Sequence, residues 1–190
     1  MEKKTVTKFR WFWTWQDEAE EKWLGTMSQK GYHLISVSMP GFYTFSVSEP
    51  RNYIYRLDYQ TFHKKDRQEY LQLFRDAGWE HIGEMSAWQY FGKEVKPGET
   101  TEIFTDVESK ITKYRRVLTY LGFFYLILSG LTANIIFTGP ARSDSYPWWG
   151  NVPSVIMILT IIFFTYAIIK LLATIRRLRK LQVAGLGSIH

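Results

Sequence analysis

The chain has no cysteine among its 190 residues, so it can form neither a disulfide bond nor a thiolate metal site. It has four histidines, none of them paired with a glutamate at metal-binding spacing. Glycine-rich phosphate-binding loops and the Gly-x-Ser-x-Gly element of acyl-transfer enzymes are also missing. These absences predict a protein that is not an enzyme and that uses no cofactor and no metal.

Acidic residues almost disappear from the second part of the chain. Residues 110–190 hold ten Lys and Arg but only one acidic residue, Asp144, whereas residues 1–109 hold 14 basic and 17 acidic residues. The net charge of +6 therefore belongs to the second part, where the basic residues flank apolar runs. This pattern indicates membrane topology and not phosphate binding, so no nucleic-acid partner is expected.

Charge is also missing from two long apolar runs. Residues 117–137 carry none, and residues 152–175 carry only Lys170, near the end of the run. About 20 apolar residues suffice to cross a hydrocarbon core of about 30 Å. The sequence therefore predicts two transmembrane helices, joined by a short external loop at 138–151, with the lipid bilayer as a partner.

Basic clusters at both ends of this predicted hairpin indicate its orientation. By the positive-inside bias, we expect a two-pass plasma-membrane protein with both termini in the cytoplasm, including a basic tail at 176–190. The amino terminus lacks the apolar core and cleavage site of a secretory signal, which agrees with a cytoplasmic first domain. The topology-determining residues are Lys110, Lys113, Arg115, Arg116, Arg176, Arg177, Arg179 and Lys180.

Residues 1–96 contain an internal repeat. At an offset of 47 residues, seven apolar, aromatic or glycine positions match in type. Each copy begins with an alternating segment, at 7–15 and at 52–60, that predicts a strand. A helix and two further strands are expected to follow in each copy.

The predicted helices have recognisable ends. Asp17-x-x-Glu20 and Asp66-x-x-Glu69 have the spacing of capping boxes, in which the Asp accepts a helix-start N–H. Gly31 and Gly78 stand where a left-handed closing residue is wanted. A third such box, Thr105-x-x-Glu108, predicts a juxtamembrane helix that begins within the linker at 97–116 and runs directly into the first span.

Two β-α-β-β units predict an α+β domain. We expect a ferredoxin-like sandwich in which two helices cover one face of a single, mainly antiparallel sheet of about six strands. The two-helix transmembrane hairpin follows this domain.

Aromatic residues are dense before the spans, since 21 of the 33 in the chain precede residue 110. Arg10-Trp11-Phe12-Trp13 would place rings on both faces of one strand, although a half-buried sheet needs apolar side chains on one face only. Such rings fit either a covered aromatic core or a surface that binds a partner. In the second case the candidate anchors are Trp11, Trp13, Tyr55 and Tyr59.

Several of these segments resemble a known family. Lys8-Phe9-Arg10-Trp11-Phe12, Tyr53-x-Tyr55-Arg56-x-Asp58-Tyr59 and Trp88-Gln89-Tyr90-Phe91 are similar to segments of Firmicutes membrane proteins that carry the domain of unknown function number twenty-eight-twelve. The resemblance covers about the first 95 residues. It implies no activity and no site residue, but it implies an association with PadR-type transcription regulators.

Three functions remain open at this point. The first is a membrane-anchored regulatory or sensor protein whose cytoplasmic domain binds a partner protein, with a PadR-type regulator as the candidate. The second is an accessory or immunity-type subunit of a membrane complex that acts through its spans. The third is a domain that binds a small apolar ligand between its sheet and a helix. The sequence leaves the oligomeric state open.

Overall fold

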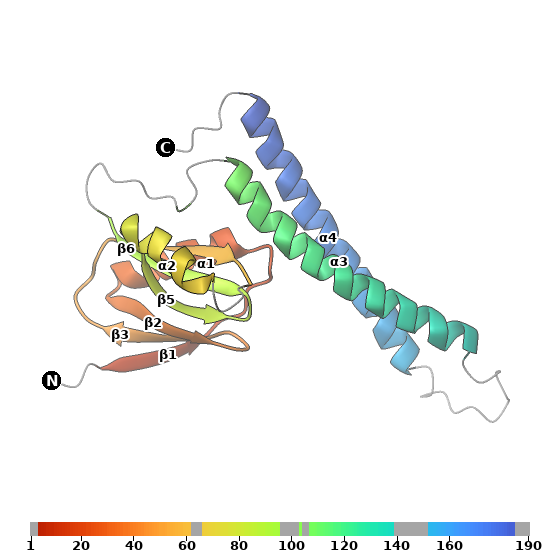
Figure 1. The fold of residues 1–190 in the computed structure, drawn as a ribbon. Coiled ribbons are helices and arrows are strands. Elements are labelled where there is room, and N and C mark those ends of the chain that lie inside the picture. The colour runs from red at the N-terminus through yellow and green to blue at the C-terminus, as the bar shows by residue number, and fades with distance from the viewer. Residues whose placement is uncertain (1–3, 62–65, 96–102, 104–106, 139–151, 185–190) are drawn as a thin grey trace.

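The protein is seen in a computed structural model that describes residues 4–61, 66–95, 103, 107–138 and 152–184. It shows an α+β domain beside a hairpin of two long helices (Figure 1). The predicted capping residue Thr105 and the predicted loop, apart from residue 138, lie outside the described residues.

Six strands form two antiparallel sheets of three strands each. The first sheet has the order β1-β3-β2 and the second the order β4-β6-β5, so the two copies of the repeated unit arrange their strands alike. The strands are β1 (Thr5–Phe9), β2 (Tyr32–Ser38), β3 (Phe42–Val47), β4 (Tyr53–Tyr59), β5 (Glu80–Met85) and β6 (Trp88–Glu94).

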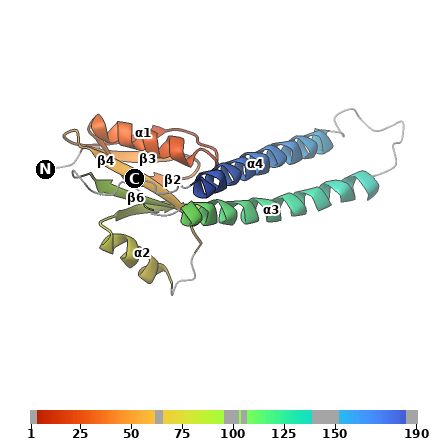
Figure 2. The same cartoon turned by 90° about the horizontal axis from the view of Figure 1, so that it is seen from above.

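This arrangement corrects the expected single sheet with both helices on one face. β2 and β5 are neighbours in space, but within the described part of the chain no ladder joins the two sheets. The helices α1 (Asp17–Gln29) and α2 (Arg67–Asp76) lie on opposite sides of β4 and β6 (Figure 2).

The physical reason is that the second sheet is apolar on both faces. Phe91 packs with Phe74 of α2 on one face. Tyr90, the preceding residue of β6, points to the other face and packs with Leu24 of α1. Because successive side chains of a strand alternate between faces, each face needs its own cover.

The predicted helix ends are confirmed at both glycines, whereas the predicted capping hydrogen bonds are wrong. Gly31 and Gly78 have φ of 82° and 81°, the left-handed conformation that glycine adopts without a Cβ penalty. Asp66 is the N-cap residue of α2, as predicted, whereas the N-cap of α1 is Gln16. Among the described residues, neither helix has a side-chain capping hydrogen bond. Asp17 is instead the first helical residue, and its carboxylate turns toward α3 (Val107–Thr138).

The predicted strand at 7–15 is shorter than expected. β1 ends at Phe9, and the Arg10 N–H donates to the Gly41 carbonyl at 2.9 Å in the turn that precedes β3. Beyond this point, Trp13 and Gln16 form a turn of their own, in which the Gln16 N–H donates to the Trp13 carbonyl at 2.7 Å. The segment 10–16 therefore leaves the sheet.

The helices α3 and α4 (Val152–Val183) are long and apolar enough to cross a membrane. As expected, α3 runs without a break from the juxtamembrane region through the predicted first span. The two helices pack against each other, and the first turns of α3 lie beside the last turns of α4. Their outer faces expose large apolar side chains, including Phe123, Leu126, Leu131, Ile156, Leu159, Ile162 and Ile169.

Candidate functional site

The domain and the helix hairpin share one hydrophobic core. Tyr59 and Ala87 from the domain are buried together with seven residues of the helices, and Trp15 and Trp88 pack against this cluster. The helical members are Val107, Ile111, Tyr114, Val117, Leu171, Ile175 and Leu178. We call this cluster, together with the ion pair between Asp17 and Lys113, the joint.

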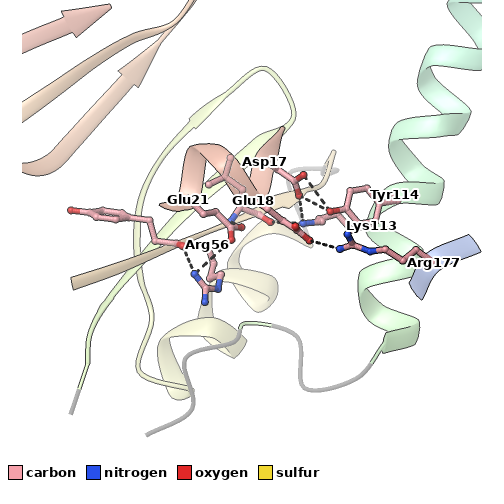
Figure 3. A network of polar contacts seen from close by, with 9 residues as sticks. Asp17, Glu18, Glu21, Arg56, Lys113, Tyr114 and Arg177 are labelled. Atoms are coloured by element: carbon pink, nitrogen blue, oxygen red, sulfur yellow. Dashed lines mark hydrogen bonds and ion pairs between the residues drawn. The ribbon is translucent and has the colours of Figure 1, made fainter. Parts of the chain in front are cut away.

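The joint contains a buried ion pair (Figure 3). Lys113 of α3 donates to the Asp17 carboxylate at 2.6 Å, and the two residues are 4% and 3% exposed. The Tyr114 hydroxyl donates to the same carboxylate at 3.1 Å, and Lys113 also donates to the Leu57 carbonyl at 3.3 Å. Two successive residues of α3 thus bind the first residue of α1.

A second carboxylate of α1 binds the adjacent strand. Glu21 accepts the Leu57 N–H at 2.8 Å and pairs with Arg56 at 3.6 Å (Figure 3). Burial raises the pKa of Glu21 to about 7, against the lowering effect of Lys113 and Arg56. The start of α1 is therefore held by charged contacts on two sides.

Aromatic rings make a further contact between the domain and α4. The Trp13 and Trp15 rings stack with their centroids 5.6 Å apart and an angle of 5° between them. Phe163 of α4 lies 4.9 Å from Trp13 and 5.9 Å from Trp15, and Tyr166 lies 5.7 Å from Trp15. The segment that leaves the sheet after β1 thus packs on the second long helix.

A cavity of about 230 Å³ lies beside the joint. It is bounded by residues 11–14, the turn at Met39 and Pro40, the turn between β5 and β6, and the face of α3 that carries Val117 and Leu121. Its walls are largely aromatic, with rings from Trp11, Phe12, Trp13, Tyr59, Trp88, Tyr90 and Tyr120.

One carboxylate in this cavity has no positive partner. Glu20 is 5% exposed, and its Oε1 accepts the hydroxyls of Tyr43 at 2.7 Å and Tyr90 at 2.6 Å. Burial raises the pKa of the Glu20 carboxyl, while the hydrogen bonds from Tyr90 and Tyr43 lower it. Among the described residues, no Lys, Arg or His forms an ion pair with Glu20.

The four predicted partner anchors lie in two different environments. Trp11 and Trp13 are 49% and 42% exposed at the rim of the cavity, off the strand that was expected to carry them. Tyr55 and Tyr59 are buried, and the Tyr55 hydroxyl accepts the Leu34 N–H at 3.0 Å. The two tyrosines therefore offer no surface to a partner, because they pack in the core and in the joint.

The eight basic residues lie near one end of the hairpin, but they differ in role. Lys113 is buried in the joint, where Asp17 neutralises it. Arg116 donates to the Tyr59 carbonyl at 3.4 Å, and Arg115 pairs with Glu108 at 3.4 Å. Lys110 lines a small cavity near Glu21 and Arg56, and the remaining four, all exposed on α4, are Arg176, Arg177, Arg179 and Lys180.

Sequence reasoning missed the role of two acidic residues. The spacing of Asp17 and Glu20 suggested a capping box, yet both carboxylates bind partners far along the chain. One signal was present: Tyr43 and Tyr90 occupy matching positions of the repeat, and their hydroxyls meet on Glu20. Within the described ranges, no group of three or more His, Cys, Asp or Glu side chains is placed to hold a metal ion.

Comparison with known proteins places the chain in a family. The sequence model of the family described as "Protein of unknown function (DUF2812)" matches residues 16–126, which include both Asp17 and Lys113. No curated protein and no solved structure matches the chain. The match begins after β1 and extends into α3, beyond the first 95 residues that carried the resemblance. Since it spans more than half of the sequence, the chain belongs to the DUF2812 family.

Proposed function

We propose that this protein is a membrane-anchored regulatory or sensor protein, in which the cytoplasmic domain binds a partner protein and the joint links that domain to the membrane hairpin. The observation that carries the proposal is the buried pair of Asp17 and Lys113. A simple tether needs no buried contacts between a domain and its anchor. The joint instead gives the two parts a common core, so a change in one alters the packing of the other.

The exposed faces of α3 and α4 support the membrane assignment. Large apolar side chains such as Phe123, Leu126 and Leu159 are more than half exposed when no lipid surrounds the chain. Contiguous apolar surface of this kind is favourable in lipid and costly in water.

The same end of the hairpin carries both basic clusters and the domain. By the positive-inside bias, this end faces the cytoplasm, so we propose a two-pass plasma-membrane protein with both termini inside. Trp13 and Trp15 pack on Phe163, which lies within the predicted second span.

The accessory-subunit alternative has less support from the helices. The hydroxyls of Thr132, Thr160 and Thr165 each donate at 2.8 Å to the carbonyl four residues earlier in their own helix. A hydroxyl engaged in this way has less to offer to another membrane protein. We therefore prefer a function that acts through the domain.

Co-purification tests the proposed partner. We expect the full chain, extracted in mild detergent, to retain a PadR-type regulator from the same cells, identified by mass spectrometry. Trp11 is the most exposed of the four candidate anchors. Trp11→Leu should reduce retention at least about tenfold, because aromatic anchors dominate interface energetics.

The matched control is Leu73→Ala, because Leu73 is 67% exposed on α2, away from the cavity. This variant should retain the regulator as the unchanged chain does. Absence of a PadR-type regulator from the purified material, or equal retention by Trp11→Leu, contradicts the proposed partner surface.

A further inference from the structure

We propose that the aromatic cavity beside the joint binds an organic cation with an aromatic or alkyl body, whose positive charge lies at the Glu20 carboxylate. The walls of the cavity, its charge and its position all favour such a guest.

The walls suit a cationic guest. Rings from Trp11, Trp13 and Trp88 line the space, together with those of Tyr59 and Tyr90. The face of an aromatic ring carries negative electrostatic potential and attracts a cation, most strongly when water is excluded. The same rings bury the apolar body of the guest.

Cations of the protein already lie over aromatic rings in the cavity wall, as at Phe12, and beside it, as at Trp23 and Tyr114. The Arg10 guanidinium lies 5.0 Å from the centroids of Phe12 and Trp23. The Lys113 ammonium lies 4.8 Å from the centroid of Tyr114. Arg10 and Lys113 thus contact rings of the protein itself, and neither is among the described ion-pair partners of Glu20.

The charge of the cavity is unbalanced. Two carboxylates line it, and Lys113 neutralises Asp17 at 2.6 Å. Glu20 receives only the neutral hydroxyls of Tyr43 and Tyr90, both on Oε1, and within the described residues its Oε2 accepts no hydrogen bond. A buried carboxylate is costly unless a cation or further donors compensate it. A cationic guest supplies the missing compensation.

The size and position of the cavity restrict the guest. Its volume of about 230 Å³ is a little below the range of about 300–1,000 Å³ that is usual for drug-sized ligands. Val117, Tyr120 and Leu121 form one wall, at the start of the predicted first span. The rim therefore lies where lipophilic cations concentrate, because the inner leaflet is anionic.

The site also gives the proposed sensor an input, a step that rests on the proposed function. Asp17 lines the cavity and also anchors α3. A guest at Glu20 would thus contact the joint directly. Binding itself needs neither a partner protein nor a conformational change, so a binding measurement is independent of the co-purification test.

Isothermal titration calorimetry on the full chain in detergent micelles tests the proposal, with heats from empty micelles subtracted. The probes are benzyltrimethylammonium and its uncharged carbon isostere, 2,2-dimethylpropylbenzene. The unchanged protein should bind the cation at least about tenfold more tightly than the isostere, since only the cation gains from Glu20 and the ring faces.

Glu20→Gln keeps an oxygen for the two tyrosine hydroxyls and removes the charge. It should weaken binding of the cation by at least about tenfold and leave the isostere unaffected. Glu69→Gln, at an exposed carboxylate of α2 outside the cavity, should change neither affinity.

Three results would overturn the proposal: no saturable binding of the cation, equal affinity for both probes, or undiminished cation binding by Glu20→Gln. The comparison of the two probes on the unchanged protein decides the question even if the Glu20 variant does not fold.

Discussion

At the scale of single residues, the structure depends most on Asp17 and Lys113. The two side chains are almost fully buried, so each compensates a charge that water cannot reach. Glu18 and Arg177 make a second ion pair between α1 and the hairpin, at 3.8 Å, but both of these side chains are about two-thirds exposed. The buried pair and the exposed pair therefore form a natural comparison.

Removal of one partner from the buried pair leaves an uncompensated charge. We expect Asp17→Asn or Lys113→Met alone to lower the free energy of unfolding by about 3–5 kcal/mol, and the double variant to lose clearly less than the sum. Glu18→Gln, in the exposed pair, should cost less than about 1 kcal/mol. Thermal or denaturant unfolding in detergent measures all four variants, and additive losses at Asp17 and Lys113 would show that the pair is not coupled.

The sequence identified these residues but not their partners. Asp17 has the spacing of a helix cap, and Lys113 stands in a basic cluster before an apolar run. A helix cap explains the position of Asp17 and membrane topology explains that of Lys113, without any contact between the two residues. The pairing depends on a fold that brings together residues 96 positions apart, and no local pattern carries that information.

At the scale of elements, the carboxyl-terminal ends of α1 and α2 were the most predictable features. A residue that closes a helix in the left-handed conformation should have no Cβ, and a glycine at the end of an apolar stripe meets this requirement. The end of β1 was not predictable, because it depends on where β3 and its preceding turn begin. The alternation of rings continues past Phe9, although the ladder does not.

The two closing glycines predict different responses to the same substitution. Both have positive φ, so a Cβ is strained at either position. A Cβ at Gly31 would also collide with the Ser48 carbonyl, whereas at Gly78 it would meet only the flexible end of Lys93, at 3.4 Å. We expect Gly78→Ala to cost about 1–2 kcal/mol of unfolding free energy and Gly31→Ala to cost more. Equal losses in denaturant titrations would contradict this account of the two turns.

At the scale of the whole molecule, composition revealed the division into a domain and two apolar helices. Apolar runs of this length with at most one charge are easily recognised in a sequence, and α3 and α4 cover them. The arrangement of the strands was less accessible. The pattern of aromatic residues in β4 and β6 fits two arrangements: a sheet with one exposed face, or a sheet covered on both faces. Only the tertiary packing distinguishes the two arrangements.

The shared core and the buried ion pair make the domain and the hairpin one body through the joint. Because the chain has no cysteine, two spin labels can be attached at introduced cysteines without other changes. Glu69→Cys on α2 and Ala173→Cys on α4 place them at exposed positions, one on each body.

Double electron–electron resonance on this labelled chain in lipid nanodiscs measures the distance between the labels. We predict one narrow distance distribution, which broadens when Asp17→Asn is added, because the joint then loses its ion pair. A broad distribution in the labelled chain that keeps Asp17 would show that the domain moves freely on its helices, and it would contradict the account.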